Sequence, residues 1–163
     1  MKTLLYTTDC SKHDTETLKY AYQLSTTLKA KLIVLHIYDI PPISVSTIRP
    51  RKLLQNAARA ENLSVLKQYC SKHLKDLSKE TNIEFEVQEH ISVSEGVLLK
   101  IKELSPDLLL VGMKDRHTSR GLFSGSIAKA LIEKVSCPLL IVSNTTSFKK
   151  IATIAYATDF EEG

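Results

Sequence analysis

The hydrophobic residues of this chain form short runs that alternate with longer stretches of helical periodicity. An amphipathic helix is predicted over residues 11–29, because its apolar and small residues recur at spacings of three and four: Leu18, Ala21, Tyr22, Ser25 and Leu28. Alternation of strands with such helices is typical of βαβ units and predicts an α/β domain with a mostly parallel sheet. Five runs have the length of strands: residues 3–8, 31–38, 83–91, 108–111 and 139–142.

Three further helices are expected from the same pattern. The longest covers residues 51–79, one follows the capping-box spacing Ser92-Val93-Ser94-Glu95 and reaches Leu104, and one covers 126–135. The predicted buried stripe of the long helix consists of Leu53, Ala57, Ala60, Leu63, Leu66, Cys70, Leu74 and Leu77.

The strands also differ in how strongly they are expected to be buried. The run at 31–38 is almost continuously apolar, as in a central strand, whereas 83–91 alternates with polar residues, as at a sheet edge. Right-handed crossovers then give the strand order 3-2-1-4-5, with the first two helices on one face and the last two on the other.

This order places a change of chain direction between strands 1 and 4. Open α/β sheets bind ligands at such a switch point, at the carboxyl ends of the strands. The strands end there at Thr8-Asp9 and at Gly112. A proline-containing loop over residues 39–50 follows the second strand at the same edge, where loops commonly overhang ligands.

Residues 112–126 have the composition of an anion-binding loop. Gly112 ends the fourth strand, a basic segment follows, and Gly125-Ser126 opens the next helix. Close backbone approach, free N–H donors and the helix dipole would together hold a phosphate group. Two other interpretations remain open: the basic segment is a solvated surface turn, or Ser126 is a plain helix N-cap.

One acidic residue in this loop, Asp115, works against phosphate binding. A carboxylate about 4 Å from a phosphate in a surface-like dielectric costs about 4 kcal/mol, enough to abolish micromolar binding. Lys114, Arg116, Arg120 and a protonated His117 could offset this repulsion, or Mg²⁺ could bridge Asp115 to phosphate oxygens. Equally, Asp115 could pair with those cations and fill the pocket itself.

These segments together resemble the universal stress protein family over residues 2–143. The resemblance is carried by Thr8-Asp9, by Leu35-His36-Ile37-Tyr38, by Gly112-x2-Asp115-x9-Gly125-Ser126, and by Cys137-Pro138-Leu139-Leu140-Ile141-Val142. It implies a Rossmann-like or flavodoxin-like sheet, dimers or tandem pseudo-dimers joined through the last strand, and ATP or AMP binding in some members.

The resemblance also implies site residues. Asp9, next to Thr8, would lie near the adenosine moiety, and backbone groups around Ile37 would read the adenine edge. Gly112, Gly125 and Ser126 would hold phosphates. The family motif has a second glycine where this chain has Asp115, so a domain without tightly bound nucleotide is a close alternative. Asp9 could also simply cap the first helix.

A short internal repeat suggests a second domain. Residues 154–160 echo residues 4–10 at an offset of 150, with Tyr, Thr and Asp in matching positions. We therefore interpret 1–145 as one domain and 146–163 as a linker and the first strand of a second, truncated copy. Chance recurrence, or a sixth strand of the same sheet, is the alternative.

Composition excludes several classes of protein. The net charge of +4 is modest and dispersed, without aromatic residues in a basic cluster, so we expect no nucleic-acid partner. No run is long enough to cross a membrane and no export signal is recognised, so we expect a cytoplasmic protein with reduced thiols. Cys-Ser-Lys-His occurs at 10–13 and 70–73, but the two copies have no evident reason to meet as a zinc site.

Three functions follow from the sequence. The first is a nucleotide-binding stress regulator without rapid turnover, because no recognisable catalytic constellation accompanies the loop. The second is a degenerate domain that acts through protein contacts or dimerisation. The third is a slow ATPase with Asp115 as a metal or water ligand.

Overall fold

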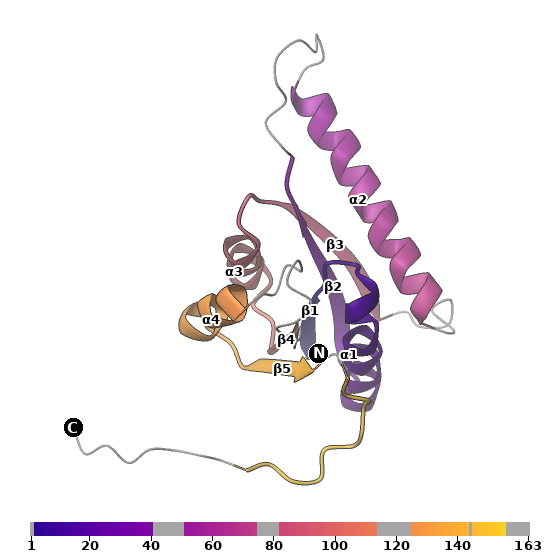
Figure 1. The fold of residues 1–163 in the computed structure, drawn as a ribbon, viewed down its shortest axis with the longest axis vertical. Coiled ribbons are helices and arrows are strands. Elements are labelled where there is room, and N and C mark those ends of the chain that lie inside the picture. Colours follow the sequence, from indigo (N-terminus) through magenta and orange to yellow (C-terminus); the bar gives the residue numbers. More distant parts are fainter. Residues whose placement is uncertain (1, 41–50, 75–81, 114–124, 144, 156–163) are drawn as a thin grey trace, which may run out of the picture.

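The computed structural model describes residues 2–40, 51–74, 82–113, 125–143 and 145–155. Their five parallel strands form one sheet in the order β3-β2-β1-β4-β5, which confirms the predicted order (Figure 1). The strands are β1 (Thr3–Thr7), β2 (Lys31–Tyr38), β3 (Ile83–Glu89), β4 (Leu108–Met113) and β5 (Leu139–Ser143).

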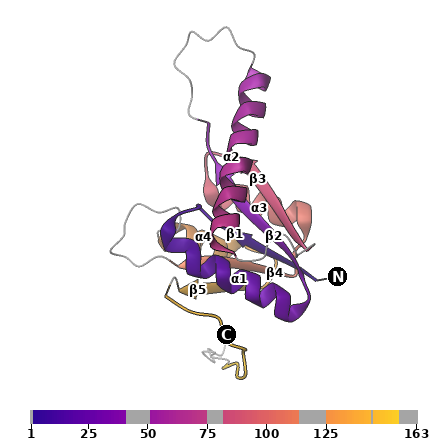
Figure 2. The same ribbon diagram turned by 90° about the vertical axis from the view of Figure 1, so that its right-hand side faces the viewer.

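Helices cover both faces of the sheet, as predicted (Figures 1 and 2). One core cluster joins the sheet to α1 and α2, and a second joins its opposite face to α3 and α4. The helices are α1 (Thr15–Leu28), α2 (Arg51–His73), α3 (Val93–Leu104) and α4 (Gly125–Lys134).

Successive residues of the central strands serve these two cores in turn. Leu4 and Tyr6 of β1 pack toward α1 and α2, while Leu5 between them packs toward α3 and α4. Strand β2 is apolar on both sides for the same reason. Strand β3 lies at the sheet edge, which confirms the expectation from its alternating pattern, and its Glu84 and Glu86 keep ion pairs with Lys31 and Lys100.

Of two predicted helix starts, the first is changed and the second is confirmed. The first helix is preceded by a separate 3-10 turn, η1 (Lys12–Asp14), so α1 begins at Thr15 rather than near Ser11. Cys10 adopts a left-handed conformation with φ 59°, which interrupts any regular helix before that point. Ser92 is the N-cap of α3, and its hydroxyl accepts a long 3.5 Å hydrogen bond from Glu95 N, which is one half of the predicted capping box. The other half is absent, because Ser92 N donates to His90 Nδ1 at 3.0 Å.

The buried stripe predicted for α2 is wrong in its first half. Leu53 is 59% exposed, and Ala57 and Ala60 are also exposed. The amino-terminal half of α2 extends beyond the sheet, so its apolar residues have little to pack against (Figure 1). In the second half Leu66, Cys70 and Leu74 lie in the core, as predicted, whereas Leu77 lies outside the described residues. Helix α2 ends at His73 rather than at residue 79.

The segment after β5 folds back onto α1. Thr146 N donates to Ser143 O, and the ring of Phe148 meets that of Tyr20 edge-on at a centroid distance of 5.2 Å. Beyond it, Ile151 is 51% and Ile154 86% exposed, and residues 151–155 form neither helix nor strand. The rest of the repeat, residues 156–160, lies outside the described residues, so the second domain stays a prediction.

Candidate functional site

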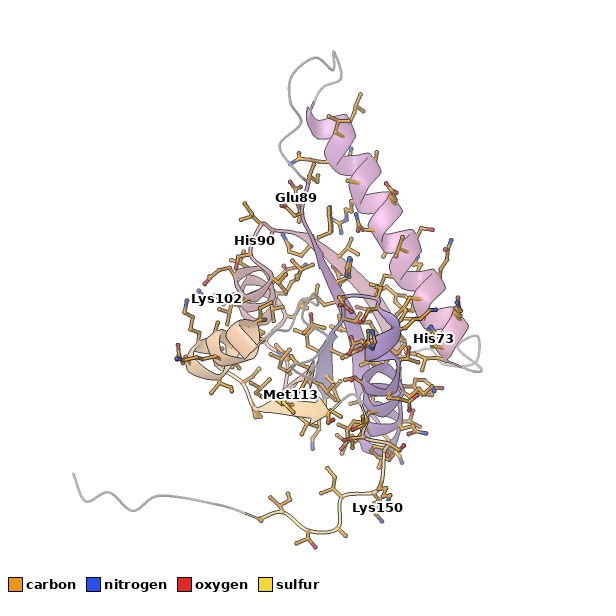
Figure 3. The ribbon with its side chains drawn as sticks, in the orientation of Figure 1. His73, Glu89, His90, Lys102, Met113 and Lys150 are labelled. Carbon is orange, nitrogen blue, oxygen red and sulfur yellow. The ribbon has the colours of Figure 1, made fainter. Side chains whose placement is uncertain are left out.

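The carboxyl ends of three strands lie side by side at the predicted switch point. The middle strand, β1, ends before its two neighbours, and we call the resulting edge a step. Thr7, the last residue of β1, pairs with Leu35 on one side and with Val111 on the other. Strand β2 continues to Tyr38 and β4 continues to Met113, which Figure 3 labels, so both neighbours run past the end of β1. The register thus brings the ends of β1, β2 and β4 to the same edge of the sheet.

The turn after β1 is held by its own side chains. Thr8 N donates to Leu35 O at 2.9 Å, and Thr8 Oγ1 accepts from Cys10 N at 3.1 Å. Asp9 Oδ1 accepts from Ser11 N at 2.9 Å, which ties this carboxylate to the backbone just before η1. This bond lies within the turn and does not cap α1, whose N-cap residue is Asp14, so the alternative that Asp9 caps the first helix is wrong. The place of Asp9 near a ligand stays a prediction.

The side chain and the backbone groups of Ile37 face different parts of the structure. The side chain is buried in the core against α3 and α4. Leu35 O points toward β1, where it accepts from Thr8 N, and groups two residues apart along a strand point the same way. The N–H and C=O of Ile37 therefore face the side of β1, just past the point where β1 ends.

Gly112 is packed against the start of α1. A Cβ atom added to Gly112 would lie 2.5 Å from Asp14 Oδ1 and 2.9 Å from Thr17 Oγ1. Its φ is not in the left-handed region, so the need for glycine is steric rather than conformational. The sequence pattern did not single out Asp14, although β1 and β4 were predicted to be neighbours.

Asp14 is a buried acid at this step in the sheet. It is 3% exposed, and its Oδ2 accepts a 2.7 Å hydrogen bond from the hydroxyl of Tyr6. Burial raises the pKa of Asp14 to about 6, an effect opposed by hydrogen bonds from Thr8 and Tyr6 and reinforced by the nearby charge of Asp9. Burial likewise raises the pKa of Tyr6 well above its ordinary value.

The loop that carries the predicted phosphate contacts is only partly described. Gly125 and Ser126 form the first turn of α4, so Ser126 lies inside the helix rather than at the N-cap position preceding it. Lys114, Asp115 and Arg116 lie outside the described residues, as do His117 and Arg120. Thr8, Ile37 and Gly112 are thus placed at one edge, and the charge balance around Asp115 stays a prediction.

The cysteines are free thiols, as predicted. Burial raises the pKa of both Cys10 and Cys70 to about 12. The ring of His73 lies 5.1 Å from that of Tyr69.

Within the described ranges, no group of three or more His, Cys, Asp and Glu residues could hold a metal ion. The same part of the chain contains no helix long and apolar enough to cross a membrane.

Comparison with solved structures identifies the fold. A universal stress protein in complex with cAMP superposes with a TM-score of 0.63 and 21% identity, over 88% of this chain and 98% of that one. UspA from Lactobacillus plantarum gives 0.61 and 18% over 86% and 97%. A family protein from Burkholderia pseudomallei gives 0.60 and 19% over 86% and 95%.

The sequence comparisons point the same way. No curated protein sequence matches the chain. Its residues 1–143, however, match the Universal stress protein family, and this range includes all five strands and four helices described above. The chain therefore belongs to the universal stress protein family.

Proposed function

We propose that this domain is an adenine-nucleotide-linked stress regulator without rapid turnover, with its nucleotide site at the step formed by β1, β2 and β4. The observation that carries the proposal is the register that ends β1 at Thr7 while β2 and β4 continue past it. The backbone of Ile37 faces this step and Gly112 borders it. Further support comes from the fold neighbour that is bound to cAMP.

In this proposal the adenine lies against Ile37 and the phosphates lie toward Gly112, Gly125 and Ser126. The helix α4 begins at Gly125, and the positive end of its dipole there would favour an anion. Asp115 weakens binding by charge repulsion, and Lys114, Arg116 or Mg²⁺ reduce that penalty.

Calorimetric titration of ATP, AMP and cAMP, with and without Mg²⁺, tests this proposal. We expect weak binding by the wild type and at least tenfold tighter ATP binding by Asp115→Asn and Asp115→Gly. The Asn variant removes the charge without adding backbone freedom, so it separates repulsion from loop flexibility. Glu133→Gln removes an exposed carboxylate elsewhere, on α4, and serves as the control for net charge.

The outcomes are distinct. Micromolar ATP binding by the wild type with no gain in either Asp115 variant would show that Asp115 does not repel the nucleotide. No binding of any nucleotide by wild type or variants would contradict the nucleotide function altogether.

A second candidate function, association through protein contacts, is favoured by the edge position of β5 in the sheet. Strand β5 is last in the strand order, and Leu139, Leu140 and Ile141 are only partly buried. An uncovered edge strand offers backbone donors and acceptors to another strand. We propose a second copy of this chain as the partner.

Sedimentation velocity and hydrogen exchange test this association. We expect dimers to form as concentration rises, with slower exchange of the β5 amides in the dimer. A monomer at all concentrations, or exchange of β5 that is independent of concentration, would contradict it.

A further inference from the structure

We propose that the outer face of α2 binds the same face of a second copy of this chain, as an antiparallel helix pair centred on Ser64. This inference does not depend on nucleotide binding. It also concerns a different surface from the β5 edge, because α2 packs on β2 and β3, at the other end of the strand order. One copy can therefore use both surfaces at once.

The outer face of α2 is uncovered between residues 53 and 71. Its residues share one side of the helix and are all exposed: Leu53, Ala57, Ala60, Glu61, Ser64, Lys67, Gln68 and Ser71. Positions 53, 57, 60, 64, 67 and 71 alternate spacings of four and three, which is the repeat of a helix face that packs against another helix. Within the described part of the chain, this face has no such partner.

The shape and hydrogen bonding of this face suit contact with a second helix. A groove of about 480 Å³ is lined by Ala60, Leu63, Ser64, Lys67, Gln68 and Ser71. Two of its polar side chains are already bonded within α2, since Gln68 Nε2 donates to Ser64 Oγ at 3.4 Å and Ser71 Oγ donates to Gln68 O at 3.0 Å. Covering these groups therefore leaves them with hydrogen-bond partners.

The charges on the face favour a second copy as the partner, in the antiparallel direction. Glu61 and Lys67 lie three residues before and three residues after Ser64. Neither has an ion-pair partner among the described residues. An antiparallel pair centred on Ser64 brings Glu61 of each copy level with Lys67 of the other, so opposite charges face each other twice. A parallel pair would instead bring like charges level.

The position of α2 on the domain leaves room for this pair. Each sheet packs against the inner side of its own α2, so the two sheets lie on opposite sides of the helix pair. The amino-terminal half of α2, which extends beyond its own sheet, is then covered by the carboxyl-terminal half of the second α2 (Figures 1 and 2). Ala57 and Ala60, which the sequence pattern assigned to a buried stripe and which are exposed in one copy, become covered.

Cysteine cross-linking in the 163-residue chain tests the alignment. Ser64→Cys places a thiol at the centre of the pair, so mild oxidation should join two copies through one disulfide. Ser71→Cys is the matched control, because its two thiols would lie about 21 Å apart along the helix axis. A mixture of Ala57→Cys and Ser71→Cys should form a mixed dimer, because these positions are level. Wild type gives the background from the native cysteines.

Three results of this experiment would overturn the proposal. One is no covalent dimer of Ser64→Cys above the wild-type background. Another is cross-linking of Ser71→Cys as fast as that of Ser64→Cys, which would indicate a parallel pair or random collision. The third is the absence of a mixed dimer of Ala57→Cys with Ser71→Cys.

Charge reversal in the Ser64→Cys protein tests the two ion pairs and is insensitive to association through β5. Lys67→Glu should slow cross-linking at least about fivefold, because both attractions become repulsions. Adding Glu61→Lys should restore the rate to within about twofold. Lys129→Glu, at an exposed position on α4, changes the net charge equally and should leave the rate unchanged. A rate that Lys67→Glu does not lower, or that Glu61→Lys does not restore, would overturn the proposal.

Discussion

Residue 112 is a glycine because of a steric contact that the loop motif does not reveal. The motif suggests that glycine lets the backbone approach a phosphate or adopt a positive φ. The structure gives Gly112 neither a left-handed conformation nor free space, because Asp14 and Thr17 occupy the position where a Cβ would project. The residue therefore connects the candidate site to the buried start of the first helix.

Gly112→Ala should destabilise the fold. The added methyl group would overlap Asp14 Oδ1 at 2.5 Å, and relief requires a shift of a buried, hydrogen-bonded side chain. Overpacking of this kind costs about 1–3 kcal/mol in the free energy of unfolding, measurable by urea denaturation. Gly96→Ala is the matched control with a smaller expected loss, because its nearest contacts are 3.0 and 3.1 Å. Equal losses in both variants would contradict the steric argument.

Asp14 also makes a distinct contribution to stability as pH changes. Burial raises its pKa in the folded protein to about 6, above the ordinary aspartate value of 3.8, so the folded state binds the proton more tightly. The ionised form is the costly one, and lowering the pH from 7.5 to 4.5 should add roughly 2 kcal/mol to the free energy of unfolding from this group.

The comparison with Asp14→Asn isolates that contribution from the other acids. The amide oxygen can still accept the hydrogen bond from Tyr6, so the difference in stability between wild type and variant reports the titration. Urea denaturation at both pH values should show the difference moving in favour of wild type by that amount as the pH falls. A constant difference would mean that Asp14 ionises with an ordinary pKa.

Among the elements, α2 shows where sequence periodicity reaches its limit. Helical spacing predicted that a helix exists and that Leu66 and Cys70 face the core, because both pack on the sheet. The same spacing wrongly placed Leu53 in the core, since periodicity records which residues share a face but not how far the sheet extends beneath them. The register of β3 against β2 and the reach of the sheet are long-range properties.

The segment after β5 depends on one aromatic contact. Phe148 is the only partly buried residue among described residues 145–155, and the chain beyond it carries Lys149 and Lys150 (Figure 3 labels Lys150). Phe148→Ala should release this segment from Tyr20 and raise the rate of trypsin cleavage after these lysines severalfold. Ile151→Ala alters an exposed side chain and should not change the rate. Equal rates in all three proteins would show that Phe148 does not anchor the segment.

For the whole molecule, sequence predicted the strand order and the edge of the sheet at which a site would form. It could do so because handedness and strand length constrain the topology strongly. It did not predict the buried contact from Asp14 to Gly112, because that contact depends on where α1 begins, and a left-handed Cys10 and a 3-10 turn shift that point. Packing details of this kind come from tertiary structure, not from local pattern.

The boundary of the folded unit can be tested by shortening the chain. A protein ending at Lys150 keeps all the strands and helices described above as well as Phe148, and loses residues of which 151–155 are exposed. Its free energy of unfolding should match that of the 163-residue chain within about 0.5 kcal/mol in urea denaturation.

A protein ending at Thr145 is the control for that truncation, because it also lacks Phe148. It should lose roughly 1–2 kcal/mol, since the partly buried ring no longer covers Tyr20 and its neighbours in the core. If the chain ending at Lys150 loses as much as the shorter one, residues 151–163 contribute to the same cooperative unit. The echo of residues 4–10 at 154–160 would then belong to this domain's own sheet rather than to a second copy.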